Sequence, residues 1–139
     1  MPCQEHLGEM RDRRSEFEAL GATVVAAGFS PAGAMADLAD HLHWPWSVVA
    51  DPERRLYRRL GLERAALRQV FSPGAIRRYR QAAARGAEVH RPVEDARQLG
   101  GDAVIDRRGM VMLRRQAGPD DRPSVTAILD AVKVAASSA

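Results

Sequence analysis

Apolar residues at the start of the chain recur at helical spacing, three or seven residues apart, with charged residues between them. The apolar positions within residues 3–20 are Leu7, Met10, Phe17 and Leu20. They predict one amphipathic helix. Pro2 suits the first turn of such a helix, and Gly21 suits the left-handed residue that ends it. Cys3 is therefore expected close to the helix N-terminus.

Two short, largely apolar runs, residues 22–29 and 46–50, predict strands, since they are too short for helices. A strand without polar alternation is typical of a parallel sheet that is covered on both faces. A Ser-Pro pair and an Asp-Pro pair follow the runs and match the cap and first-turn residues of a helix. We therefore expect helices over residues 30–41 and 51–61, the second ending at a glycine.

The second half of the chain predicts an exposed helix, a hairpin and a closing helix. Residues 72–86 begin with Ser-Pro and end with Gly, but arginines leave little apolar face, so we expect this helix on the surface. Apolar residues 103–105 and 110–113 flank a short turn that ends at Gly109, the pattern of a β-hairpin. The apolar positions of the closing helix are Val125, Ile128, Leu129, Val132 and Val134. Strands that alternate with helices, followed by a hairpin, indicate an α/β fold with a mixed parallel and antiparallel sheet.

The length of 139 residues suits a single domain, residues 1–139, with one hydrophobic core. A single cysteine cannot form an internal disulfide, which fits a reducing compartment. The N-terminal residues lack the apolar stretch of a secretory leader, and no apolar run is long enough to cross a bilayer. We therefore expect a cytoplasmic protein that has no membrane partner.

Basic charge is concentrated in the middle of the chain. Residues 53–91 hold eleven arginines against three glutamates, although the net charge of the whole chain is only +3. Such a segment either forms solvated helix faces or attracts an acidic partner. Its aromatic residues, Tyr57, Phe71 and Tyr79, are scattered, and no base-reading motif accompanies them, so we expect no nucleic-acid binding. Solvated helix faces are the interpretation that we favour.

Three further motifs favour structural roles. The His-Leu-His segment at residues 41–43 lacks the neighbouring carboxylates or cysteines that would complete a metal site, so we expect helix-end capping and no metal or cofactor. The Trp-Pro-Trp segment at 44–46 enters an apolar run and is expected in the core. The Gly-Gly pair at 100–101 lacks the pattern of a phosphate-binding loop and indicates a close backbone approach before a strand.

Three stretches together carry a resemblance to a known family. They are PCQEH at residues 2–6, ADPERR at 50–55 with Tyr57 and Gly61 beyond it, and QLGGD at 98–102 leading into Val104, Asp106 and Gly109. In this order they resemble the peroxiredoxin-like branch of the alkyl hydroperoxide reductase and thiol-specific antioxidant superfamily. The resemblance implies a thioredoxin-like sheet flanked by helices. It also implies thiol-dependent reduction of a peroxide or a similar small oxidant.

The sequence departs from that family at its start. Residues 2–6 resemble only the end of the family's Cys-Pro-x-Cys motif, so Cys3 takes the place of the second cysteine and the first would fall before Met1. The family's first strand, which lies in the middle of its sheet and precedes the cysteine helix, is missing as well. We hypothesise that the start is clipped or misassigned, or that another chain supplies the strand.

The resemblance makes Cys3 and His6 the candidate catalytic residues. A helix N-terminus stabilises a thiolate, and His6 is expected one turn further along the same helix. The candidate supporting residues are Pro2, Glu5, Arg97, Gln98, Gly100 and Gly101. Attack on a peroxide would convert the thiol to a sulfenic acid, which an external thiol reductant must reduce because the chain has no second cysteine. The expected partners are that reductant and the small oxidant, with a homodimer as a candidate assembly.

These residues also fit other interpretations. Cys3 fits the resolving thiol of a two-cysteine site as well as a sole nucleophile, and it also fits a terminal thiol that only packs on the helix. His6 fits a histidine on the helix surface, and Arg97 fits an ordinary exposed arginine. The whole chain fits a second function, a catalytically inactive thioredoxin-like interaction module that binds a partner through residues 53–91.

Overall fold

The computed structural model describes residues 2–62, 64, 73–85, 97–117 and 121–138. In chain order the helices and strands are α1 (Pro2–Asp12), α2 (Arg14–Ala19), β1 (Val25–Gly28), α3 (Ala32–His41), β2 (Ser47–Ala50), α4 (Arg55–Arg59), α6 (Pro73–Ala84), β3 (Gly101–Asp106), β4 (Gly109–Arg115) and α7 (Val125–Ser137). This order confirms the predicted alternation of strands with helices, followed by a hairpin and a closing helix.

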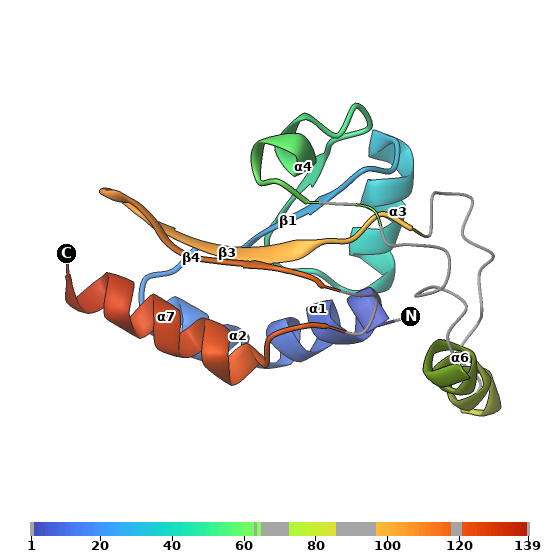
Figure 1. The fold of residues 1–139 in the computed structure, drawn as a ribbon. Helices are drawn as coiled ribbons and strands as arrows, with labels where there is room; N and C mark the ends of the chain where they lie inside the picture. The colour runs from blue at the N-terminus through green and yellow to red at the C-terminus, as the bar shows by residue number, and fades with distance from the viewer. Residues whose placement is uncertain (1, 63, 65–72, 86–96, 118–120, 139) are drawn as a thin grey trace.

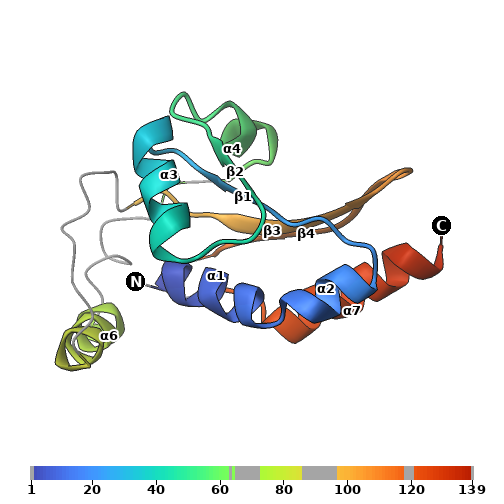
Figure 2. The same cartoon turned by 180° about the vertical axis from the view of Figure 1, so that it is seen from behind.

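The helices lie in layers around the strands (Figure 1). α1, α2 and α7 lie along one face of the β3–β4 hairpin, whereas α4 lies on the opposite side of the hairpin. The view from behind shows the same layers, with α6 standing apart from the other helices (Figure 2). The start of α1 lies at the end of the hairpin where β3 begins and β4 ends.

The strands form two separate pairs. β1 and β2 are parallel, with Val25 opposite Ser47 and Gly28 opposite Ala50. β3 and β4 are antiparallel, and the turn between them ends at Gly109, which has a φ of 132°. The α/β class and the hairpin are therefore confirmed, but the described residues form two sheets rather than a single mixed one. The reason is that no strand among these residues pairs with both halves.

Both strand pairs pack against one apolar core. Phe17 from α2 and Leu129 from α7 are its most deeply buried large side chains, each 1% exposed. The other buried members are Met10, Trp44, Val104, Val125 and Ile128. Val104 comes from β3, and Ala26 of β1 and Val48 of β2 pack against the same cluster. Because burial of apolar surface is the dominant favourable term in folding, this shared core joins the two sheets.

The Trp-Pro-Trp segment lies in the core, as predicted. Trp44 is 9% exposed, and its ring meets that of Trp46 edge to face at a centroid distance of 5.1 Å. Trp46 in turn meets Phe17 edge to face at 5.9 Å. These aromatic contacts link α2 to the segment that leads into β2.

The region predicted as one helix over residues 3–20 is two helices. The chain leaves helical geometry at Arg13, where φ is −101° and ψ is 22°. At this break the Arg13 guanidinium pairs with Glu16 at 2.7 Å and donates to the Thr126 hydroxyl of α7 at 2.7 Å. Both predicted ends are confirmed, since α1 begins at Pro2 and Gly21 has a φ of 69°.

The prediction that the strand within residues 22–29 is covered on both faces is wrong. β1 is shorter than the apolar run, and Val25 is 54% exposed. Val49 of β2 and Ile105 of β3 also expose apolar surface, at 45% and 65%. β1 pairs with only one described strand, so its side chains have fewer neighbours than those of a strand in the interior of a sheet.

Helix ends follow the predicted chemistry at several positions. Gly61, with a φ of 66°, follows α4, and the Ser124 hydroxyl caps the first turn of α7. α4 begins later than predicted, but the Asp51 carboxylate accepts the backbone N–H groups of Arg55 and Leu56, both at 2.8 Å. Asp51 therefore serves its predicted capping role from outside the helix.

Some predicted details of the helices are wrong. Pro31, not Ser30, directly precedes α3, and no side chain caps that helix end. Val134 is 58% exposed, because it lies two residues after Val132 and so turns away from the buried face of α7. The predicted ends of the 72–86 helix lie outside the described residues, although α6 begins at Pro73. None of the helices in the described ranges is long and apolar enough to span a membrane.

Two truncations on α7 test the assignment of the core. Leu129→Ala removes a side chain that is 1% exposed, and we expect a loss of about 2–5 kcal/mol in the free energy of unfolding because a cavity remains. Val134→Ala, on the exposed face of the same helix, should change it by about 0.5 kcal/mol or less. Urea unfolding measures both, and equal losses would contradict the proposed core.

Candidate functional site

A buried histidine connects α1 to the β3–β4 hairpin. His6 is 6% exposed, and its Nε2 atom lies 3.0 Å from Oδ1 of Asp102 on β3. The two residues are 96 positions apart in the sequence, so only the folded chain brings them together. The expectation of a surface histidine is therefore not met, and His6 belongs to the buried face of α1.

Asp102 has a second polar partner on the segment that precedes α7. Nη1 of Arg122 lies 3.4 Å from Asp102 Oδ2, and the two side chains are 19% and 14% exposed. A carboxylate with so little solvent contact is costly unless it is paired and hydrogen-bonded. His6 and Arg122 supply one partner for each of its two oxygens.

Gly100 and Gln116 extend this group of polar residues. The backbone N–H of Gly100 donates to Gln116 Oε1 at 2.6 Å, and the backbone N–H of Gln116 donates to the Gly100 carbonyl at 3.1 Å. A Cβ atom at Gly100 would lie 3.0 Å from Arg122 Nη2, so the Arg122 guanidinium is packed directly against this backbone. We call His6, Gly100, Asp102, Gln116 and Arg122 the polar cluster.

The Gln116 side-chain amide has a fixed orientation. Because its oxygen accepts the Gly100 N–H, its nitrogen must point the other way. This nitrogen is buried and has no hydrogen-bond acceptor among the described residues. The polar cluster thus contains one buried N–H₂ donor that is open to a water molecule or another acceptor.

Cys3 lies in the first turn of α1, as the sequence predicts. The side chains of Cys3 and Pro2 lie outside the described part of the structure. Glu5 is exposed, so it lies off the buried face that carries His6. On a helix, residues three apart are neighbours on one face, which places Cys3 and His6 on the same side of α1.

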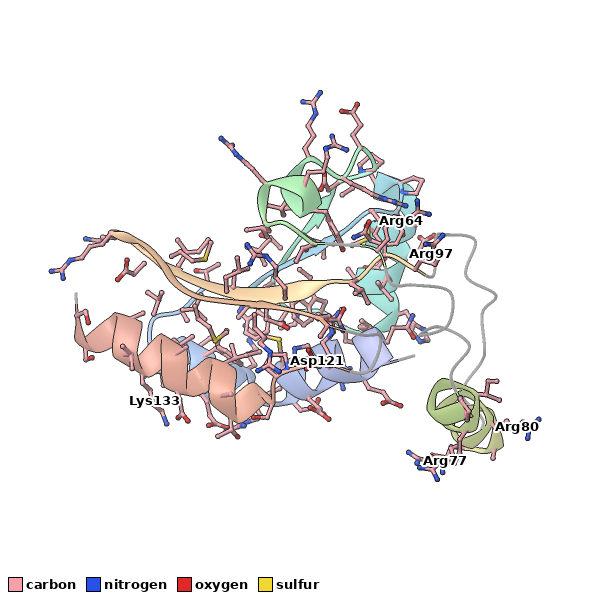
Figure 3. All side chains as sticks on the ribbon, viewed as in Figure 1. Arg64, Arg77, Arg80, Arg97, Asp121 and Lys133 are labelled. Carbon is pink, nitrogen blue, oxygen red and sulfur yellow. The ribbon has the colours of Figure 1, made fainter. Side chains whose placement is uncertain are left out.

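Arg97 and Gln98 lie just before the polar cluster. The Gln98 amide nitrogen donates to the carbonyl oxygens of Leu62 at 3.4 Å and Leu99 at 3.0 Å, and Gln98 forms an antiparallel bridge with Arg64. Arg64 and Arg97 lie at the same end of the molecule (Figure 3). Gln98 therefore ties its segment to residues 62–64, and a role for Arg97 beside the thiol stays a prediction.

The Gly-Gly pair permits the close backbone approach that the sequence indicates. A Cβ atom at Gly101 would lie 2.8 Å from the Arg114 carbonyl oxygen and 2.9 Å from Leu62 Cδ2. Such distances are shorter than real Cβ contacts. A side chain at Gly101 would thus push β3, which carries Asp102, away from β4.

Asp102, Gln116 and Arg122 were not among the candidate site residues, although Asp102 ends the QLGGD stretch that carries part of the family resemblance. A signal for Asp102 is present, because it lies two residues before Val104 and so shares the buried face of the same strand. An acidic residue at such a position needs partners in the folded state. Arg122 and Gln116 carry no comparable signal, since both lie in or beside a polar, proline-containing segment.

The arginines of the segment 53–91 whose side chains are described are exposed, except for Arg54, which is half-buried. Arg55 pairs with Glu53 at 2.7 Å, and the guanidinium of Arg54 stacks over the Phe29 ring at 4.7 Å. Arg77 and Arg80 of α6 project away from the other helices (Figure 3). These positions agree with solvated helix faces. The His-Leu-His segment joins no cluster that could hold a metal ion within the part of the chain that the structure describes.

One carboxylate beside the cluster has a perturbed ionisation. The Ala117 backbone N–H, and after it the Arg114 guanidinium, hold the pKa of Asp121 below its usual range. The Arg114 contact is 2.8 Å long, and Figure 3 shows Asp121 between the hairpin and α1. Asp121 thereby links the end of β4 to the segment that leads into Arg122.

The parallel strand pair, the late hairpin and the closing helix are consistent with the thioredoxin-like class of α/β proteins. The family model described as AhpC/TSA antioxidant enzyme matches residues 9–117, more than half of the chain. The chain therefore belongs to the AhpC/TSA antioxidant enzyme family, and the resemblance seen in the sequence is confirmed. The comparison with curated proteins gives no match. The matched range includes Asp102 and begins after Cys3 and His6.

Substitution of the second glycine tests the tight backbone approach. Gly101→Ala places a Cβ atom 2.8 Å from a backbone oxygen, and we expect a loss of about 1–3 kcal/mol in the free energy of unfolding. Gly33→Ala is the matched control, because a Cβ atom there meets nothing within 4 Å and alanine favours helix α3 by about 0.5–1 kcal/mol. Urea unfolding should show a lower free energy of unfolding for Gly101→Ala and a higher one for Gly33→Ala. An unchanged free energy in Gly101→Ala would contradict the close contact between Gly101 and the Arg114 backbone.

The depressed pKa of Asp121 predicts a pH-dependent stability difference. Above the unfolded-state pKa of about 3.9 the ionised carboxylate stabilises the folded state, and this contribution disappears as the pH falls through the lower folded-state pKa. Asp121→Asn should therefore be less stable than the wild type near neutral pH and equally stable in strong acid. Urea unfolding midpoints of the two proteins, measured across the acid range, test this prediction. A difference in stability that grows as the pH falls would contradict it.

Proposed function

We propose that the protein is a thiol peroxidase that reduces a peroxide or a similar small oxidant through Cys3, with His6 beside it. Membership of an antioxidant enzyme family supports the reaction class. The observation that carries the proposal is a buried histidine, held by a carboxylate, on the helix whose first turn contains Cys3. A terminal thiol that only packs on α1 would need no such partner.

The reaction begins with the thiolate of Cys3, which the N-terminus of α1 stabilises. Its sulfur attacks one peroxide oxygen, so that an S–O bond forms, the O–O bond breaks and the leaving oxygen takes up a proton. The product is a sulfenic acid, two electrons more oxidised than the thiol. Because Cys3 is the single cysteine of the chain, two equivalents of an external thiol must return it to the thiol, with release of water and a reductant disulfide.

The remaining parts of the proposal follow from the sequence. A chain with one cysteine is suited to a reducing compartment, so we propose that it acts in the cytoplasm. A homodimer is the candidate assembly. Arg97 is the candidate cation near the thiol, on the loop that leads into Gly100 and Gly101.

Trapping of the sulfenic acid tests the function. After brief treatment with hydrogen peroxide, dimedone should add to Cys3 in the wild type, and Cys3 should oxidise at least about tenfold faster than free cysteine because its thiolate is stabilised. Mass spectrometry locates the adduct, and Cys3→Ser controls for reaction at other residues. Oxidation no faster than that of free cysteine would remove the proposed activity.

A further inference from the structure

We infer that Asp102 is a positioning residue that fixes the tautomer of His6, so that His6 Nδ1 is the base that accepts the Cys3 proton. The inference rests on the proposed function of Cys3. Asp102 was not a candidate site residue, and it lies on β3, whereas His6 and Cys3 both lie on α1. Asp102 acts through His6 and does not itself contact the thiol in this scheme.

The tautomer follows from the partners of Asp102. An ionised carboxylate only accepts hydrogen bonds, and the Arg122 guanidinium, which only donates, pairs with the second oxygen of Asp102 at 3.4 Å. The contact at 3.0 Å between His6 Nε2 and Asp102 Oδ1 therefore requires the proton to be on Nε2. A neutral His6 must then carry its lone pair on Nδ1, because only one ring nitrogen is protonated.

Nδ1 in this state can act as a base toward a group on the same face of α1. Cys3 is one helical turn before His6, and side chains on a helix lean toward its N-terminus. The proton moves from Cys3 Sγ to His6 Nδ1, leaving a thiolate and an imidazolium. The imidazolium keeps its Nε2–H on Asp102, so the new positive charge lies beside a fixed carboxylate.

Few other charged groups of the described residues bear on His6. On α1 itself, Glu5 and Glu9 are exposed. On α7, which packs against α1, Asp130 and Lys133 are exposed and interact with Arg13 and Glu16 further along the chain. Across the hairpin the facing groups are Asp102 and Arg122. Within the part of the chain that the structure describes, the pairing with Asp102 is thus the dominant electrostatic contact of the imidazole.

The unchanged protein gives the first test. Nitrogen NMR of histidine-labelled protein, at a pH where His6 is neutral, should show the proton on Nε2. A signal from the Nδ1–H tautomer would overturn the inference. This measurement does not depend on any variant folding.

The second test is the pH profile of Cys3 alkylation by iodoacetamide. Asp102→Asn should slow alkylation near neutral pH by at least about tenfold, since the amide no longer enforces the Nε2–H tautomer. His6→Gln should slow it to the same extent, and the double variant should be no slower than either. Asp102→Glu keeps the charge and should restore part of the rate.

Asp106→Asn is the matched control. Asp106 lies on the same strand, but its carboxylate accepts the turn N–H groups of Arg108 and Gly109, its hydrogen-bond donors among the described residues, and an asparagine oxygen also accepts them. Its alkylation profile should equal that of the wild type. A wild-type profile in Asp102→Asn, together with slower alkylation in His6→Gln, would remove the role of Asp102 and leave the peroxidase function intact. Failure of peroxide to oxidise Cys3 would instead remove the proposed function, whatever the tautomer of His6.

Discussion

Packing around Phe17 and Leu129 is the interaction on which the rest of the structure depends. The described strands form two separate two-stranded sheets, so ladder hydrogen bonds do not join the halves of the molecule. Apolar contact does so instead, because Val104 of the hairpin lies within the cluster against which Ala26 and Val48 of the parallel pair also pack. A hydrophobic core is not directional, and it can therefore unite elements whose backbones do not pair.

The same packing determines where the polar cluster forms. α1 and α7 lie on one face of the hairpin, and the start of α1 meets the end at which β3 begins (Figure 1). This arrangement brings together His6, Asp102 and Arg122 from three distant parts of the sequence. The cost of burying the Asp102 carboxylate is offset by partners on both of its oxygens, which makes the junction specific as well as stable.

Family membership and site chemistry rest on different parts of the chain. The family match covers both strand pairs and starts after His6, so it establishes the class of protein rather than the role of the thiol. The first turns of α1 and the carboxylate that pairs with His6 support the proposed role of the thiol. The exposed arginines of α4 and α6 contribute to neither argument.

The spacing of apolar residues and the positions of proline and glycine determined the local structure of this protein. Apolar spacing, proline at helix starts and glycine at helix ends act within a few residues, so the hairpin, the closing helix and the stops at Gly21 and Gly61 could be predicted. The break at Arg13 and the exposure of Val25 could not, because each depends on what other elements pack nearby. The burial of His6 and its pairing with Asp102, 96 residues away, were likewise decided by tertiary structure alone. Sequence patterns report which face of an element is apolar, whereas the partner of a buried polar group depends on which distant elements the core brings together.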